Sequence, residues 1–299
     1  MVTIDRILCP VDFSGHSRVA LDYATALARW YDAEVIALHA YAVAMVPATI
    51  GAFPAATAVG VPLTRQEVQH DLDHFVGPVV AAGVKTTTTV ATGGAAKSIL
   101  DAAERLPASL IVMGTHGASG FERLMLGSVT EKVLRKAKCP VLVVTRHADA
   151  PSGTPLLFRR IVCAVDFSSC SNSAVSYALS LAEEGGGAVT FLHVVEGFDE
   201  EPLATAHFNV PEYRQHLQAA AEERLKTLVP DETRSWCDCK TVVRAGKAYR
   251  EILATAAAID ADLIVLGVRG RNPVDLALFG STTNHVVRAA NCPVLTVRT

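Results

Sequence analysis

The sequence lacks a strong net charge, because 30 acidic residues nearly balance 27 lysines and arginines and leave -3 at pH 7. These charges are spread along the chain, so no basic face is offered to a nucleic-acid backbone or to an anionic membrane. We therefore expect neither nucleic acid nor membrane as a partner.

The beginning of the sequence has no long apolar run. A short apolar stretch is ended by Pro10 and Asp12, too soon for the core of a signal peptide or for a membrane span. The seven cysteines are an odd number, and several of them lie in or beside apolar runs, where a reduced cysteine behaves as a small hydrophobic residue. We expect a cytoplasmic protein without a disulfide framework.

The same landmarks occur twice along the chain. Residues Ile7–Ser14 (ILCPVDFS) return 154 positions later as Ile161–Ser168 (IVCAVDFS). With an offset of 153, Cys139–Leu142 returns as Cys292–Leu295. The same offset relates two sets of glycines, Gly114, Gly117 and Gly127 and then Gly267, Gly270 and Gly280. Landmarks whose offsets differ by only one residue over such distances indicate a duplicated domain.

The length of 299 residues suits two domains of about 150 residues each. Between Arg146 and Phe158, proline, glycine and serine interrupt all periodicity and are typical of a linker. We expect one domain over residues 1–146, a linker over 147–158 and a second domain over 159–299.

Within each copy, apolar runs of strand length alternate with longer stretches of helical period, which predicts an α/β fold with a parallel sheet and helices on both faces. The expected strands of copy one lie near residues 4–11, 34–41, 84–91, 109–114 and 139–145. Those of copy two lie near residues 159–165, 188–195, 235–244, 262–267 and 292–298.

The connection after the second strand differs between the copies. Residues 43–63 are almost wholly apolar but are broken by prolines and glycines, whereas residues 196–211 are acidic. Each segment is either a mobile surface loop or a lid or partner-binding segment, because long loops in compact domains are often functional.

A glycine-rich turn follows the fourth strand of copy one. The run Leu110–Gly117 (LIVMGTHG) is followed by nine residues and then by Gly127–Thr130 (GSVT), where a helix begins. Such a turn presents backbone N–H groups without side chains in the way, and the helix adds its unpaired amino-terminal donors and positive dipole end. Hydroxyls of Ser128 and Thr130 can add donors, so the turn predicts a site for phosphate.

The spacing G-x2-G-x9-G-[S/T] resembles the nucleotide-binding signature of the universal stress protein family. It fits both sets of glycines, and the Val-Asp-Phe-Ser and Cys-Pro-Val-Leu landmarks also resemble that family. A single glycine-rich turn is often only a tight turn, but two complete and equally spaced copies favour nucleotide binding.

The resemblance implies two flavodoxin- or Rossmann-like domains, each with a five-stranded parallel sheet of order 3-2-1-4-5, and an adenine nucleotide such as ATP at the switch point between strands one and four. The residues implied for copy one are Pro10, Val11, Asp12, Ala40, Met113 and Gly114 around the adenosine, and His116, Gly117, Gly127, Ser128, Val129 and Thr130 around the phosphates. The matching residues of copy two are Ala164, Val165, Asp166, Val194, Leu266, Gly267, Arg269, Gly270, Gly280, Ser281, Thr282 and Thr283.

Copy two departs from copy one at several of these positions. Ala164 replaces Pro10, Arg269 replaces His116, and Phe279 stands where copy one has Leu126, so the second pocket should differ in shape. Arg269 and Arg271 either contact a triphosphate or are solvated surface arginines.

A structural role is an alternative interpretation for some of the polar residues. Asp12 and Asp166 either lie beside a ribose, a water or Mg²⁺, or only neighbour a helix N-cap at Ser14 and Ser168. We expect His39 and His193 to be hydrogen-bonded structural residues. The Cys237-Asp238-Cys239 run lacks a partner pair at zinc spacing and reads as a strand.

The predicted phosphate cradle of each copy consists of the glycine-rich turn after the fourth strand and the start of the helix that follows it. This cradle is rich in hydrogen-bond donors and holds no obvious base beside a γ-phosphate. The primary hypothesis is therefore a stress-response binding module whose ATP occupancy alters shape or assembly, with at most slow turnover. Alternatives are a Mg²⁺-dependent ATPase or nucleotidyl-transfer enzyme using Asp12 or Asp166, and a nucleotide-independent interaction protein using residues 43–63. Family members pair through their final strand, which implies that the two copies pair with each other and that two chains then form a four-domain dimer. We also expect a protein partner, whose identity the sequence does not reveal.

Overall fold

The computed structural model describes residues 2–41, 64–115, 126–145, 148, 158–196, 210–230, 233, 235, 237–268 and 280–298. The apolar segment 43–63, the acidic segment 197–209 and linker residues 149–157 lie outside these ranges.

Each half alternates strands and helices, and every expected strand is present within three residues of its expected bounds. The first half consists of β1 (Arg6–Pro10), α1 (Gly15–Tyr31), β2 (Glu34–Tyr41), α2 (Arg65–Ala81), β3 (Thr86–Thr92), α3 (Ala95–Arg105), β4 (Leu110–Gly114), α4 (Ser128–Lys136) and β5 (Val141–Val144). The second half consists of β6 (Arg160–Ala164), α5 (Ser169–Gly185), β7 (Ala188–Val195), α6 (Val210–Leu228), β8 (Asp238–Ala245), α7 (Ala248–Ala258), β9 (Leu263–Gly267), α8 (Ser281–Ala289) and β10 (Val294–Val297).

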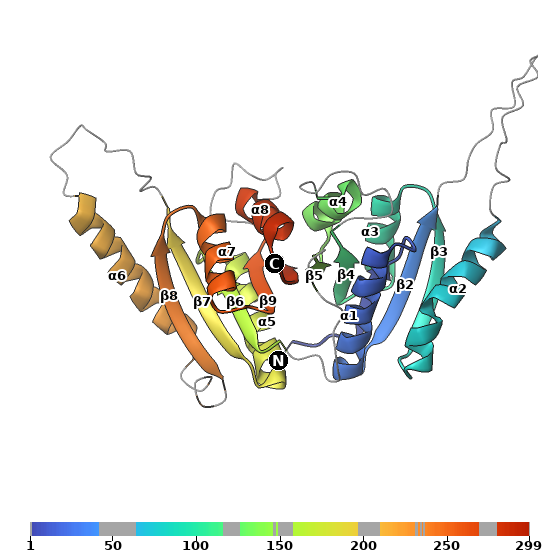
Figure 1. Ribbon diagram of the computed structural model, residues 1–299, viewed down its shortest axis with the longest axis horizontal. Helices are drawn as coiled ribbons and strands as arrows, with labels where there is room; N and C mark the ends of the chain where they lie inside the picture. Colours follow the sequence, from blue (N-terminus) through green and yellow to red (C-terminus); the bar gives the residue numbers. More distant parts are fainter. Residues whose placement is uncertain are drawn as a thin grey trace, which may run out of the picture.

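The ten strands form one continuous sheet of order β3-β2-β1-β4-β5-β10-β9-β6-β7-β8 (Figure 1). All pairs within a half are parallel, and each half has the order 3-2-1-4-5 that the resemblance implied. The halves meet where β5 and β10 pair antiparallel, with Val143 opposite Val294 and Leu142 opposite Leu295. The expectation that the two copies pair through their final strands is therefore confirmed.

Helices cover both faces of this sheet, so the inner strands are buried on both sides and form near-continuous apolar runs in the sequence, whereas the outer strands β3 and β8 are largely polar and only partly buried. One core contains buried residues of α1, α2, α5 and α6, and the other contains buried residues of α3, α4, α7 and α8. Each core draws residues from both halves of the chain. The fold class is therefore α/β, as expected.

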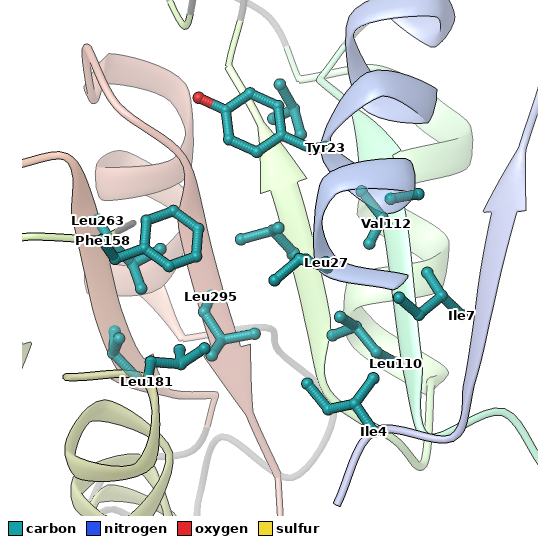
Figure 2. Close-up of a cluster of buried hydrophobic side chains, with 14 of the residues drawn as sticks. Ile4, Ile7, Tyr23, Leu27, Leu110, Val112, Phe158, Leu181, Leu263 and Leu295 are labelled. Carbon is teal, nitrogen blue, oxygen red and sulfur yellow. The ribbon is translucent and has the colours of Figure 1, made fainter. Parts of the chain in front are cut away.

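The first of these cores passes through the join between the halves (Figure 2). Leu27 of α1 and Leu295 of β10 belong to it, together with Leu181 of α5. Phe158, which the linker was expected to include, is buried in the same core with 5% of its surface exposed. An aromatic ring buries a large apolar area, so Phe158 belongs to the second half rather than to a solvated connection.

No described helix is both long and apolar enough to cross a membrane.

Candidate functional site

The predicted adenosine-contacting residues of copy one lie at the carboxyl ends of three neighbouring strands. Pro10 ends β1 and is followed by Val11 and Asp12, Ala40 lies near the end of β2, and Met113 and Gly114 end β4. Strand β1 lies between β2 and β4, so parallel pairing brings these residues to one edge of the sheet. This edge is the switch point of the strand order, where ligands of such sheets bind.

Copy two has the same arrangement at the ends of β6, β7 and β9. Its residues there are Ala164, Val165, Asp166, Val194, Leu266 and Gly267. The turn residues His116, Gly117, Arg269, Gly270, Arg271 and Phe279 lie outside the described residues.

The two predicted phosphate helices begin without a side-chain cap. Gly127 is the N-cap of α4 and Gly280 is the N-cap of α8, and neither N-cap residue accepts a hydrogen bond through a side chain. A helix leaves its first backbone N–H groups without intrahelical partners, and its positive dipole end favours an anion. The exposed Ser128 and Ser281 add a hydroxyl beside each set of amides. These starts can therefore hold a phosphate group.

The threonines of the two cradles already have hydrogen-bond partners. Thr130 Oγ1 donates to the carbonyl of Gly114 at 2.9 Å, and Thr283 Oγ1 donates to the carbonyl of Gly267 at 3.3 Å. Both side chains are buried, with 3% of their surface exposed. In the described structure these hydroxyls fasten the first turn of each phosphate helix to the end of the preceding strand, so they set the position of the cradle.

The carboxylates of Asp12 and Asp166 are held by the serines that cap the next helices. Asp12 Oδ1 accepts from Ser14 N at 3.1 Å and from Ser14 Oγ at 2.6 Å. Asp166 Oδ1 accepts from Ser168 N at 3.0 Å. Ser14 and Ser168 cap α1 and α5, and their side chains accept from the backbone N–H three residues on. These contacts are the ones that the N-cap alternative expects, and a role beside ribose or Mg²⁺ stays a prediction.

Two phenylalanines beside these aspartates were not singled out from the sequence. Phe13 and Phe167 have φ angles of 63° and 62°, a left-handed conformation that L-residues with bulky side chains avoid. Their rings lie against His39 and His193, with centroids 4.5 and 4.6 Å apart. The signal that could have found them is the Asp-Phe-Ser run itself, present in both copies and followed by a histidine on the next strand.

The histidines have the structural role that we expected. His39 Nδ1 lies 2.7 Å from the carbonyl oxygen of Val11, and His193 Nδ1 lies 2.7 Å from that of Val165. Both carbonyls belong to the turn between strand and capped helix, so each histidine fixes the backbone that carries the aspartate.

The Universal stress protein family matches residues 3–145 and again residues 157–298. The chain belongs to this family. A universal stress protein of Mycolicibacterium smegmatis is 26% identical over 304 residues, covering 98% of this chain and 96% of that protein. A universal stress protein of Methanocaldococcus jannaschii is 38% identical over 151 residues, covering 47% of this chain and 82% of the relative.

Among solved structures, a universal stress protein from Archaeoglobus fulgidus is similar over both halves. It aligns with a TM-score of 0.67 and 24% identity, covering 99% of this chain and 97% of that one. The similarity shows that the fold of the whole chain also occurs in an experimentally determined structure.

In the described structure of this universal stress protein, none of the seven cysteines forms a disulfide. Burial, together with the nearby charge of Asp22, raises the pKa of Cys9 to about 12. Cys237 is buried, and its thiol donates to the carbonyl of Gly187 at 3.4 Å. Across the residues that the structure describes, no cluster of three histidine, cysteine or acidic side chains could hold a metal ion. Asp238 and Cys239 lie on β8, as the strand interpretation expected, whereas the buried Cys237 lies just before this strand rather than on a surface strand.

Proposed function

We propose that each half of this tandem universal stress protein binds ATP or another adenine nucleotide, and that the chain is a regulatory binding module rather than a fast catalyst. The observation that carries the proposal is the repeated cradle, in which an uncapped, glycine-started helix is fastened to the end of the fourth strand of each half. One such helix start is common in proteins. Two such helix starts favour a nucleotide, because each belongs to the nucleotide-binding signature of the family and each lies at the switch point of its half.

In this proposal the nucleotide lies across the switch point. Pro10, Val11, Asp12 and Ala40 border the adenosine of copy one, with Met113 and Gly114 nearby. The backbone amides of Ser128, Val129 and Thr130 hold the phosphates, together with the turn that contains His116 and Gly117. The matching residues of copy two hold a second nucleotide, with Arg269 in place of His116.

A regulatory role is supported by the chemistry of the described cradle. Catalysis of phosphoryl transfer needs a group that positions or deprotonates the attacking water. The carboxylate of Asp12 is engaged at the cap of α1, and the hydroxyl of Thr130 is engaged at Gly114. These groups fix the site in place, which suits retention of a ligand more than turnover.

Isothermal titration calorimetry tests the proposal directly. The wild-type chain should bind ATP at two sites, and Gly127→Val should remove the first site while Gly280→Val removes the second, because each side chain would enter the space where phosphate approaches the backbone. ADP, AMP and cAMP are titrated in parallel. We include cAMP because a universal stress protein that matches 47% of this chain was solved in complex with it.

A matched control is Gly77→Ala in α2, where an added Cβ meets nothing within 4 Å. This variant should keep both sites. The absence of binding heat with every adenine nucleotide in the wild type, or full binding by both valine variants, would contradict the proposal.

The enzyme alternative makes a different prediction. If Asp12 or Asp166 acts with Mg²⁺, phosphate release should be Mg²⁺-dependent, faster than about one per second, and abolished by Asp12→Asn together with Asp166→Asn. We expect instead that phosphate is released more slowly and that each single variant leaves this slow release in place.

We also propose that the protein acts in the cytoplasm and that any dimer of two chains uses a surface other than the final strands.

A further inference from the structure

One side chain of the second half reaches a phosphate helix of the first. Arg298 directly follows β10, and its Nη2 donates to the carbonyl of Leu134 at 2.9 Å and to that of Arg135 at 2.6 Å. Both carbonyls belong to the last turn of α4, the helix whose amino end forms the proposed cradle of copy one. The contact spans the join between the halves.

The contact from Arg298 provides hydrogen-bond donors and a positive charge at the carboxyl end of α4. The last carbonyl groups of a helix have no intrahelical donors, and a cation at this end interacts favourably with the helix dipole. The guanidinium of Arg298 provides both, as a donor shared by two carbonyls and as a positive charge.

Helix α4 is therefore held at both ends. Thr130 fastens its first turn to Gly114, and Arg298 fastens its last turn to the chain beyond β10. With nine residues and a rise of 1.5 Å per residue, α4 is about 13 Å long and behaves as a short rigid rod. Where the carboxyl end is fixed, the direction of the amino-terminal N–H groups is fixed as well.

The matching position in copy one cannot make the reverse contact. Thr145 lies 153 residues before Arg298, at the same place after the final strand. Among the residues that the structure describes, its buried hydroxyl has no hydrogen-bond partner and so caps no carbonyl of α8. At this position the two halves thus differ, although their glycines match.

The strand before Arg298 also touches the second cradle. Val297 pairs with Gly267 of β9, and its carbonyl accepts from Val268 N at 2.9 Å. Arg298 is thus one residue away from the strand end that forms the proposed site of copy two.

We propose that Arg298 is a positioning residue for the phosphate cradle of the first half, supplied by the second half. This inference rests on the proposed nucleotide binding. Arg298 touches no nucleotide in this arrangement and acts through α4, so it favours ligands that carry phosphate over ligands that do not.

The test measures copy one alone, in a Gly280→Val background that silences copy two. Adding Arg298→Ala should weaken ATP binding by about fivefold, the usual size of a charge effect at a helix end, and should leave adenosine binding unchanged. Arg298→Lys should recover part of the loss, because lysine keeps the charge but not the planar fork. Thr145→Ala, the matched control, should change neither ligand.

The reciprocal measurement uses a Gly127→Val background, in which only copy two binds. Arg298→Ala should leave ATP binding there unchanged. The inference would be overturned if Arg298→Ala weakened the binding of ATP and adenosine equally, or weakened ATP binding equally at both sites. It would also be overturned if the ATP affinity of copy one stayed within about 1.5-fold of that of the parent.

A substitute variant is available if the first one fails to fold, and the possible outcomes separate this inference from the proposed function. If Arg298→Ala does not fold, Arg298→Gln replaces it, since glutamine keeps amide donors without the charge, and the same outcomes apply. If the parent binds ATP and the variants bind it equally well, only this inference fails. If the wild-type chain binds no adenine nucleotide, the proposed function fails and this inference fails with it.

Discussion

The glycines of the nucleotide signature serve different needs. A Cβ added at Gly267 would lie 2.9 Å from the backbone carbon of Cys170 and 2.9 Å from Ser171 N, closer than real Cβ contacts allow. A Cβ added at Gly280 would meet only the carbonyl oxygen of Val268 at 3.3 Å and Thr283 Oγ1 at 3.7 Å. Close packing of β9 against the first turn of α5 therefore requires Gly267 whether or not a nucleotide binds.

This difference predicts two kinds of variant. Gly267→Ala should lower the free energy of unfolding by about 1–3 kcal/mol, because the added methyl forces the strand and α5 apart. Gly280→Ala should lower it by less than about 1 kcal/mol, because its contacts need only small shifts. Urea denaturation of both variants measures the two values. Equal losses would show that the motif glycines share one structural role.

The buried thiols predict a loss of stability at alkaline pH. Burial raises the pKa of Cys9 from its ordinary value of 9.0 to about 12, and it raises the pKa of Cys163 as well. Above pH 9 the unfolded chain loses these protons while the folded chain keeps them. Stability from these groups is thus complete below pH 9 and falls as the pH rises toward the folded pKa, by up to about 1.4 kcal/mol per pH unit for each thiol.

Urea titrations between pH 8 and 11 measure this dependence, and the double variant Cys9→Ala, Cys163→Ala should show a shallower decline than the wild type. A cavity left by the removed sulfur lowers stability equally at every pH, so the slope separates the two effects. Identical slopes would mean that other groups cause the decline.

Residue types and spacing predicted where the site residues lie, but not all of their contacts. The glycines, aspartates and histidines could be placed because strand ends and helix starts are readable from apolar runs. The hydrogen bond from Thr130 to Gly114 could not be predicted, since it depends on the distance between two separate segments of the chain. The left-handed conformation of Phe13 could not be predicted either, because the backbone conformation of a single residue leaves no periodic pattern in a sequence.

At the scale of elements, the helices that follow the first strand of each half start at a serine. Ser14 accepts from Ser17 N at 3.2 Å, and Ser168 accepts from Ser171 N at 3.2 Å. Each serine also donates its own backbone N–H to the neighbouring aspartate. The cap therefore joins the start of a long helix to the turn that carries Asp12 or Asp166.

Removing these caps should cost stability. Ser14→Ala or Ser168→Ala is expected to lower the free energy of unfolding by about 1 kcal/mol each, because a first-turn N–H loses its acceptor. Thermal or urea unfolding measures the loss. Ser176→Ala, on the exposed side of α5, is the control and should stay within about 0.5 kcal/mol of the wild type. A similar loss at Ser176 would show that the loss is not specific to the N-cap, because alanine has a higher helix propensity than serine.

The elements themselves were largely predictable. The inner strands, which are buried on both faces, give apolar runs without alternation, whereas the outer strands β3 and β8 are largely polar and only partly buried. All ten strands lie where the sequence predicts a strand. The limits of the linker were less readable, because Phe158 follows prolines and glycines that suggest a solvated segment. Its burial is decided by the core that it meets and not by its neighbours in sequence.

At the scale of the whole molecule, β5 and β10 join two five-stranded sheets into one. Thr296 Oγ1 donates to the carbonyl of Val141 at 3.1 Å within this buried join, and Leu295 packs with residues of both halves (Figure 2). The edges of β5 and β10 are thereby covered, and β3 and β8 are the outer strands of the sheet. A dimer of two chains stays a prediction, and it has no final-strand edge to use.

The join predicts cooperative unfolding of the two halves. Calorimetry of the wild type should show a single transition whose calorimetric and van't Hoff enthalpies agree. Leu295→Asp should place a carboxylate in the buried join, cost more than about 3 kcal/mol, and split the transition in two. Val80→Asp, at a position 57% exposed on α2, is the control and should leave the single transition in place. Two transitions in the wild type would contradict the prediction.

Fusion of the two copies changes how their shared boundary can evolve. When identical subunits meet across a twofold axis, any substitution at the boundary occurs on both sides at once. In this chain, Val143 and Thr296 occupy matching positions on the two paired strands and are different residues, as are Thr145 and Arg298 just beyond them. Each half therefore meets a different sequence across the join, so a substitution on one side leaves the other side unchanged.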